Sequence, residues 1–385
     1  MTIVPPNIAS RYLQRRVLLL SLIPLALLFA ITVTLARTYH VREAGLVQEW
    51  YDKGNADLIA GRSGDAIEDF RNALSYDPEN NLVQPRLAEA LLADGRVTEA
   101  RSYFLNLWDR APGSGEVNLD LAHISIRTGD ADQAIRYFRS AIYGSWDKDP
   151  AQQRRNARLE LCKFLLQRGR VSDARAEVAG LAADTPADDA DLLEKTGQLF
   201  SQVGETGRAL SEYEDALRIN PRQDQWLEDA GKAAVAVGDY TKAETYLARA
   251  DRENPSDEIA GLRDTVRDVL DGDPFLPGLS DSEQAERSWR AFQQGNKRLG
   301  ICTGARDAAQ SSGETSPELQ DLIKEALDLK VHVNLQTLGR QSELRNQAMQ
   351  FVFQVEEINS PGCGTPDAAD QALVLIAKRH SGSTP

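Results

Sequence analysis

The sequence predicts an all-α protein, built from repeated pairs of helices between an apolar N-terminal helix and a small C-terminal helical bundle. Alanine and leucine, two strong helix formers, are abundant along the chain. A glycine recurs about every 34 residues, in a constant setting of small and apolar residues. Twenty residues without a charge, 17–36, precede the first of these glycines. Each of these features predicts helix by a different physical route.

The repeated pattern is centred on six glycines, whose successive spacings are 34, 34, 40, 35 and 34 residues. The glycines are Gly61, Gly95, Gly129, Gly169, Gly204 and Gly238. Five residues after each glycine comes alanine: Ala66, Ala100, Ala134, Ala174, Ala209 and Ala243. Seven residues before each comes a small residue: Gly54, Ala88, Ala122, Cys162, Gly197 and Gly231. Nine residues after comes a large apolar residue: Phe70, Phe104, Phe138, Val178, Tyr213 and Leu247. Seventeen residues after comes proline in five of the six, and Trp146 breaks that series.

This pattern is what a pair of packed helices requires. The glycine ends the first helix, where the chain adopts a left-handed conformation that glycine reaches at least cost. The small residue and the alanine are expected to face each other where the two helices cross, and the large apolar residue to fill the gap between neighbouring units. Proline follows the second helix because it cannot continue it. Such units cannot bury their apolar faces alone, so they stack.

The period and these residue types resemble the tetratricopeptide repeat family. The resemblance implies a right-handed α-solenoid of six units over residues 47–257. The expected units are 47–80, 81–114, 115–148, 155–188, 190–223 and 224–257. Six extra residues around Trp146 separate the third and fourth units and indicate either a lengthened turn or a longer helix.

The family resemblance also implies a binding surface. In this family the first helix of each unit lines a concave groove, and set positions on it point inward. Here the implied partner-binding residues are Tyr51, Asn55, Arg86, Glu89, Asp120, His123, Arg127, Lys163, Gln198 and Lys232. Further inward positions are Glu160, Gln167, Glu194, Gln202 and Glu228. This mixture suits a peptide of mixed charge, and a solvated surface without a ligand would look similar.

Some family members clamp a partner's C-terminal carboxylate with lysine, asparagine and arginine side chains. Only Asn55 matches that set, since Tyr51 stands where a lysine is needed, so this ligand is not predicted. His123 is interpreted as a polar surface residue, because no motif places a carboxylate or a nucleophile beside it.

Residues 17–36 are predicted to form a transmembrane helix that follows a cytoplasmic tail, 1–16. At 1.5 Å per residue the segment reaches about 30 Å, the thickness of a bilayer's hydrocarbon core. Pro24 lies inside the segment, and membrane helices tolerate proline. A cleaved signal peptide is the alternative, but its apolar region is usually about 7–15 residues long.

The orientation follows from the flanking arginines. Arg11, Arg15 and Arg16 precede the segment and indicate a cytoplasmic N-terminus, while Arg37 and Arg42 follow it and reduce the asymmetry. We therefore expect a single-pass protein of the inner (cytoplasmic) membrane, with its body in the periplasm or otherwise outside the cytoplasm.

After the array, the sequence indicates a capping helix, 258–271, a proline- and glycine-containing linker, 272–280, and a helical domain, 281–380. Four helices are expected in this domain, at 281–299, 317–335, 341–358 and 367–379, from apolar residues three and four apart. A β-hairpin is the alternative, because Val331, Val333 and Leu335 alternate, as do Phe351, Phe353 and Val355.

Three cysteines are present. Cys302 and Cys363 are expected in glycine-rich loops, and outside the cytoplasm they would form a disulfide. That bond would close a loop of about 60 residues and contribute roughly 4 kcal/mol by loop entropy. Two unpaired thiols are the alternative. Cys162 occupies a small position at the helix crossing and is expected to be structural.

Charge and motifs exclude several functions. The net charge is −14, and residues 1–46 carry five arginines and one glutamate, so the remaining 339 residues sum to −18. Such an acidic body repels phosphate backbones, and no nucleic-acid partner is expected. No cofactor, no metal site and no catalytic motif is recognised. The expected function is a membrane-anchored scaffold that binds a protein or peptide, in envelope assembly or export. The alternative is a cytoplasm-facing adaptor that delivers proteins to membrane enzymes or proteases.

Overall fold

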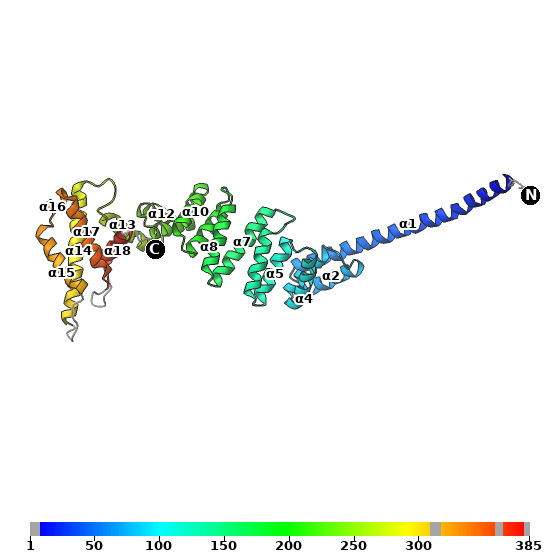
Figure 1. Cartoon of the computed structure of the whole chain (residues 1–385), viewed down its shortest axis with the longest axis horizontal. Coiled ribbons are helices and arrows are strands. Elements are labelled where there is room, and N and C mark those ends of the chain that lie inside the picture. The colour runs from blue at the N-terminus through cyan, green and yellow to red at the C-terminus, as the bar shows by residue number, and fades with distance from the viewer. Residues whose placement is uncertain (1–7, 309–316, 359–364, 381–385) are drawn as a thin grey trace, which may run out of the picture. The chain divides into compact units, whose positions relative to one another are not determined.

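A computed structural model describes residues 8–308, 317–358 and 365–380. Within a few of these helical stretches, at 8–23, 26, 40 and 304–308, only the backbone is described. The chain divides into two compact units, an N-terminal body of residues 1–161 and a C-terminal body of residues 162–385. The regular elements of the described residues are all helices, joined by turns, with one isolated bridge between Ser114 and Ser145 (Figure 1).

The N-terminal body contains the helix pairs of the first three repeats. Its helices are α1 (Ile8–Ile59), α2 (Ser63–Tyr76), α3 (Val83–Ala93), α4 (Val97–Arg110), α5 (Gly115–Arg127) and α6 (Ala131–Tyr143). The start of α7 (Pro150–Gln167) completes it. Helices that follow each other in the chain pack together, α1 on α2 and α5 on α6 most extensively.

The C-terminal body continues the repeats and adds the terminal bundle. After the rest of α7 come α8 (Val171–Asp184), α9 (Ala190–Gln202), α10 (Thr206–Ile219), α11 (Asp224–Ala236), α12 (Tyr240–Glu253) and α13 (Asp257–Gly272). The bundle contains α14 (Asp281–Ala308), α15 (Pro317–His332), α16 (Leu335–Arg340), α17 (Ser342–Glu357) and α18 (Ala368–His380).

All six repeat glycines adopt the left-handed conformation that the sequence predicts, with φ between +69° and +81°. The residue after each glycine donates its N–H to the carbonyl five residues earlier, at 2.8–2.9 Å. This bond satisfies a carbonyl that the end of the first helix would otherwise leave unpaired. The turn therefore reverses the chain in two residues and starts the second helix at a fixed angle.

The small residue at the helix crossing packs against a large side chain of its own repeat where that small residue is glycine. A Cβ added to Gly54 would lie 2.8 Å from the Phe70 ring, and one added to Gly197 would lie 2.8 Å from the Tyr213 ring. Both rings belong to the same repeat as the glycine. In these repeats the large side chain nine residues after the turn lies closest to the small residue, and the expected approach of the alanine to it stays a prediction.

The same large side chains also contact the following repeat. Ala88, Phe104 and Leu107 form one buried cluster with Leu121 and Ile124 of the next repeat. Phe104 thus has two roles, covering a small residue at its own helix crossing and filling the space between repeats, as the sequence predicts. This sharing makes each repeat depend on its neighbour for burial.

The six extra residues before the fourth repeat form both a longer turn and a longer helix. The helix α7 begins at Pro150 and has 18 residues, so it starts five residues before the expected unit at 155. In the turn, the Trp146 indole donates to the carbonyl of Ala141 at 2.9 Å and is 9% exposed. A Cβ at Gly115 would lie 2.2 Å from the Trp146 ring. Trp146 therefore takes the place of the missing proline by packing directly on the start of α5.

The C-terminal domain contains helices and no strand among its described residues, so the hairpin alternative is wrong. The residues expected to alternate in a hairpin lie in or beside α15, α16 and α17 instead. The rings of Phe292 and Phe351, from α14 and α17, lie 5.6 Å apart in its core. The helix α18 packs on both α13 and α17, so the predicted capping helix is itself covered by the last helix of the chain.

The environment of Cys302 also differs from the expectation. Cys302 lies within α14, which continues to Ala308, and it is 1% exposed rather than placed in a loop. The predicted partner, Cys363, lies outside the described residues, so their pairing stays a prediction. Cys162 is buried, as its position at a helix crossing predicts.

The predicted membrane segment, 17–36, lies within the single long helix α1, with Pro24 inside it. The structure does not confirm it as a transmembrane helix: no helix in the described part of the chain meets the length and hydropathy that a membrane crossing needs. The side chains at 17–23 and 26 lie outside that part. Where side chains are described, Leu25, Leu27, Leu28 and Phe29 are 61–70% exposed.

The alanine five residues after the turn offers a test of the packing. Ala134 is completely buried in α6, so Ala134→Leu should overpack the crossing and lower the free energy of unfolding by about 1–3 kcal/mol. Urea unfolding followed by helicity measures this, and hydrogen exchange shows whether α5 and α6 open first. The control is Ala176→Leu on an exposed face of α8. Equal unfolding curves for both variants would contradict the repeat register.

Candidate functional site

The predicted groove residues lie on the first helices of the repeats. Those in the N-terminal body come from α1 (Tyr51 and Asn55), α3 (Arg86 and Glu89) and α5 (Asp120, His123 and Arg127). In the C-terminal body they come from α7 (Lys163), α9 (Gln198) and α11 (Lys232). Tyr51, Asn55, Glu89, Asp120, His123 and Lys232 are half-buried, and the others are exposed.

Polar contacts connect the first helices of the N-terminal body. The Arg86 guanidinium binds the Glu89 carboxylate at 2.7 Å. Burial lowers the pKa of Arg86, but Glu89 and the nearby Tyr51 of α1 raise it, and the net shift is upward. The Arg127 guanidinium donates to the carbonyl of Leu92, at the end of α3, at 2.8 Å. These side chains are therefore held in place between helices rather than left free in solvent.

His123 has a partner that the sequence did not reveal. Its Nε2 lies 2.6 Å from a carboxylate oxygen of Glu160 on α7, and its ring meets the edge of Phe138 at 6.0 Å. The hydrogen bond to Glu160 raises the pKa of His123, and burial opposes that rise. His123 is half-exposed, in agreement with its interpretation as a polar surface residue, but the expectation that no carboxylate lies beside it is wrong, because Glu160 is its partner.

Asp120 is the most perturbed acid of this surface. Burial raises its pKa to about 7, and the negative charges of Glu89 and Glu116 add to the rise, while His123 and Arg86 oppose it. Near neutral pH this carboxyl group therefore exists in both protonation states. Its protonated form can donate a hydrogen bond, whereas its ionised form can only accept one.

In the C-terminal body the corresponding surface carries an acidic pair that the sequence reasoning missed in part. Glu194, an inward position on α9, is 8% exposed, and Asp229 of α11 has a buried carboxylate oxygen without a hydrogen-bond partner. Burial raises the pKa of both groups, and the negative charge of Asp229 adds to the rise at Glu194. Residue type alone gives no signal for Asp229, because many acids on these helices are solvated.

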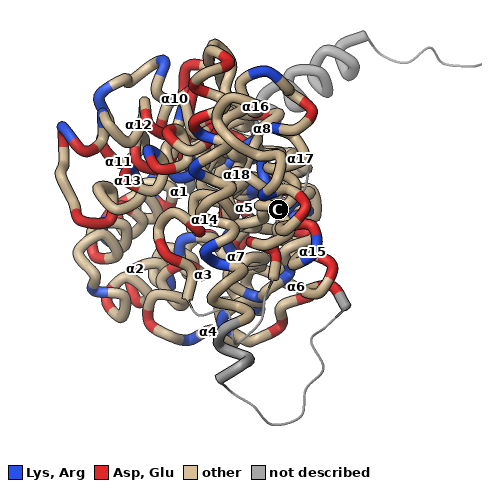
Figure 2. The backbone as a smooth tube through the Cα atoms, turned by 90° about the vertical axis from the view of Figure 1, so that its left-hand side faces the viewer, with Lys and Arg blue, Asp and Glu red and all other residues tan. Residues whose placement is uncertain are grey.

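Lys232 does not neutralise that pair. Its ammonium group lies 2.6 Å from Glu228 and 2.6 Å from Glu258 instead. Along the described helices, positions of basic residues alternate with positions of acidic ones (Figure 2). Among the described residues, no three His, Cys, Asp or Glu side chains are placed to hold a metal ion.

Comparison with protein families identifies the repeats. Two family profiles, both described as "Tetratricopeptide repeat", match this chain, one at residues 51–115 and 195–258 and the other at 91–143 and 129–199. Together these matches run without a gap over more than half of the chain.

Curated relatives are distant. The chain is 24% identical over 304 residues to a "Tetratricopeptide repeat and J domain-containing co-chaperone" of Fusarium oxysporum. That alignment covers 76% of this chain and 54% of the relative. It is 22% identical over 213 residues to "DnaJ homolog subfamily C member 3" of Bos taurus, covering 52% and 42%. The chain thus spans about half the length of the curated relatives it matches.

Solved structures with similar folds include that of pilF from Pseudomonas aeruginosa, with a TM-score of 0.41, 15% identity, and coverage of 57% of this chain and 96% of that one. Another is PilW, described as a type IV pilus biogenesis factor, with a TM-score of 0.40, 19% identity, and coverage of 56% and 97%.

Asp120 gives this surface a testable pH dependence. The pKa of Asp120 is raised in the folded chain to about 7, so folding favours its protonated form. The contribution of Asp120 to the free energy of unfolding therefore falls as pH rises from its unfolded pKa of about 4 to its folded pKa. The raised pKa of His123 acts in the same direction, since its contribution is lost as pH rises through the folded value. Asp120→Asn should therefore raise the urea midpoint at pH 8 and leave it nearly unchanged at pH 4.

The matched control is Asp109→Asn, which changes an exposed acid on α4. It should shift the midpoint little at either pH. A midpoint for Asp120→Asn that is lower than that of the wild type at pH 8 would show that the ionised carboxylate stabilises the fold.

Proposed function

Because the chain belongs to the tetratricopeptide repeat family, we propose that it is a membrane-anchored scaffold that binds a segment of a partner protein on the inward side chains of its repeats. Protein–protein interaction is the function that the repeats support. The membrane attachment, the envelope role and the residues that bind are parts of the proposal. We assign it no reaction and no cofactor.

The observation that carries this proposal is the set of polar contacts between first helices in the N-terminal body. Arg127 joins α3 to α5 and His123 with Glu160 joins α5 to α7, while Tyr51 of α1 lies near Arg86 of α3. Side chains that are already ordered lose less conformational entropy when a partner binds. A surface of this kind suits an extended or helical segment that carries both charges.

Membrane attachment is supported by the composition of α1. Residues 17–36 contain no charged residue, and Leu27, Leu28 and Phe29 expose 61–70% of their surface, which is unfavourable in water. An anchored scaffold with its body outside the cytoplasm would serve envelope assembly or export. The rival function is a cytoplasm-facing adaptor. Arginines flank the segment on both sides, Arg16 and Arg37 among them, so the difference in flanking charge that would fix the orientation is small.

Charge reversal tests the binding surface. Arg86→Glu with Arg127→Glu should weaken capture of a partner from native membranes at least several-fold without changing helicity, because two ordered cations of the surface become anions. The matched control reverses Arg101 and Arg136, two exposed arginines on α4 and α6, the second helices of their repeats. Capture quantified by mass spectrometry should fall only in the first variant. Equal recovery of every partner by both variants would remove this part of the groove from the proposal.

Thiol labelling tests the side of the membrane. If the body lies outside the cytoplasm, Cys302 and Cys363 should be oxidised together and Cys162 reduced. Labelling under denaturing conditions should then find one thiol, rising to three after reduction, with peptide mapping giving the 302–363 link. Cys162→Ala is the control and should leave no thiol before reduction. Three thiols in freshly trapped cells would contradict both the disulfide and the extracytoplasmic body, and would favour the adaptor.

A further inference from the structure

A cavity of about 510 Å³ lies in the C-terminal body, away from the predicted groove residues. It is lined by α13, α14 and the start of α18. Ala291, Leu373 and Ile376 supply an apolar floor, and the first turn of α18 contributes Ala368 and Ala369. Its size falls within the range of about 300–1,000 Å³ that is typical of small-molecule sites.

Two helices bring opposite charges to this cavity. From α13 come Asp268 and Asp271, and from α14 come Arg287 and Arg290. The members of each pair are three residues apart, so they lie on one face of their helix.

These charges do not neutralise each other. The Arg287 guanidinium donates to the main-chain carbonyls of Leu270 and Asp273, at 2.5 and 3.0 Å. Arg290 makes a longer bond, 3.4 Å, to the carbonyl of Asp271. Neither the Asp268 nor the Asp271 carboxylate forms an ion pair or a hydrogen bond with another described residue. The residues that line the cavity therefore include two carboxylates and two guanidiniums at its rim, of which Asp268, Asp271 and Arg290 are exposed to solvent.

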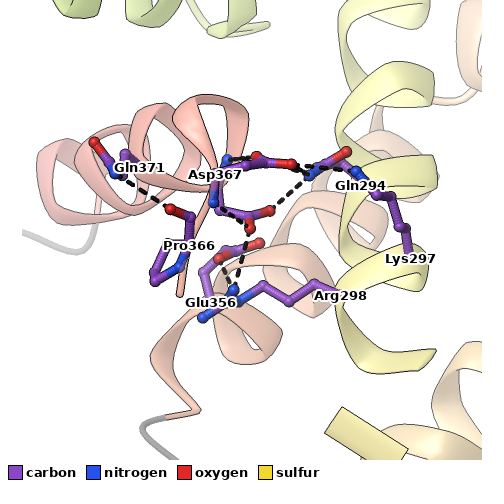
Figure 3. A network of polar contacts seen from close by, with 8 residues as sticks. Gln294, Lys297, Arg298, Glu356, Pro366, Asp367 and Gln371 are labelled. Carbon is purple, nitrogen blue, oxygen red and sulfur yellow. Dashed lines mark hydrogen bonds and ion pairs between the residues drawn. The ribbon is translucent and has the colours of Figure 1, made fainter. Parts of the chain in front are cut away.

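The wall formed by α18 is fixed in place by a polar network (Figure 3). Gln294, which lines the cavity, donates to Asp370 at 2.7 Å and to Asp367 at 3.0 Å. One turn further along α14, Arg298 binds Asp370 at 3.1 Å and Glu356 of α17 at 3.0 Å. Arg298 and its two partners are at most 7% exposed. Such a buried network holds the first turn of α18 against α14, so the cavity is formed before any ligand binds.

We propose that this cavity binds a short zwitterionic peptide with aliphatic side chains. The carboxylates of Asp268 and Asp271 receive the peptide's ammonium group, and the guanidiniums of Arg287 and Arg290 receive its carboxylate. The apolar floor takes the side chains between the two ends. A ligand of one charge would leave half of these groups unmatched, and a single amino acid would leave much of the volume empty. This site is independent of the groove and of the proposed scaffold function.

Calorimetric titration of the full chain in detergent micelles tests the proposal, with the tripeptide Ala-Leu-Leu as the probe. One peptide with free ends should bind per chain. Acetylating its N-terminus or amidating its C-terminus should each weaken binding at least tenfold, because one charged pair is then lost. No heat of binding up to millimolar peptide, or equal affinity for the free and blocked peptides, would overturn the proposal.

Substitutions locate the two ends. Asp268→Asn should lower the affinity for the free peptide at least tenfold and leave the affinity for the acetylated peptide unchanged. Arg290→Gln should likewise lower the affinity for the free peptide at least tenfold and leave the affinity for the amidated peptide unchanged. Asp264→Asn, an exposed acid one turn earlier on α13 and outside the cavity, is the matched control and should bind like the wild type. An equal loss in all three variants would overturn the assignment. Tight binding of phosphorylethanolamine with the same dependence on Asp268 would show that the cavity recognises a lipid headgroup and would overturn the peptide proposal.

Discussion

The contact between a large side chain and a small residue of the same repeat is the constraint on which the array depends. Gly54 beneath Phe70 and Gly231 beneath Leu247 leave no space for a Cβ, so the two helices of the pair approach closely. That approach sets their crossing angle, and the glycine turn between them fixes the direction of the second helix. The same large side chain then contacts the next repeat, as Phe104 does with Leu121 and Ile124. One position therefore determines both the shape of a repeat and its fit to the next.

The parts of the fold that could be predicted are those that one residue imposes on its own backbone. A left-handed turn needs glycine, and all six predicted turns are present. The contacts that could not be predicted depend on residues far apart in the chain. The indole of Trp146 packs on Gly115, 31 residues earlier in the chain. The spacing of residues within a repeat also does not reveal that the Phe70 ring, rather than Ala66, lies closest to Gly54. Cys302 appeared to lie in a loop because glycines surround it, but packing within the bundle continues α14 through them.

The candidate surface shows the same division. The family pattern named inward positions, but it could not show which of them bind each other. Glu160 proved to be the partner of His123, and Asp229 joins Glu194 only because α9 and α11 lie side by side in the array. Charged side chains that pair between helices hold each other in place on the surface. Acids that are buried together destabilise the fold when they are ionised, so they favour binding a proton or a cation. Both kinds occur on first helices here, which agrees with the partner of mixed charge that we propose for this surface.

The long helix α1 connects the proposed anchor to this surface without a break. It extends from Ile8 to Ile59 and contributes Tyr51 and Asn55 to the first repeat. If residues 17–36 occupy the bilayer, the ten residues from 37 to 46 separate it from the first repeat, a distance of about 15 Å along a helix. A flexible linker would let the repeats sample many orientations. A continuous helix instead fixes the orientation of Tyr51, and of the helices packed on it, relative to the anchor. On the proposed anchoring, the first part of the groove is thus presented close to the membrane surface, where it can meet a segment of a membrane-bound partner.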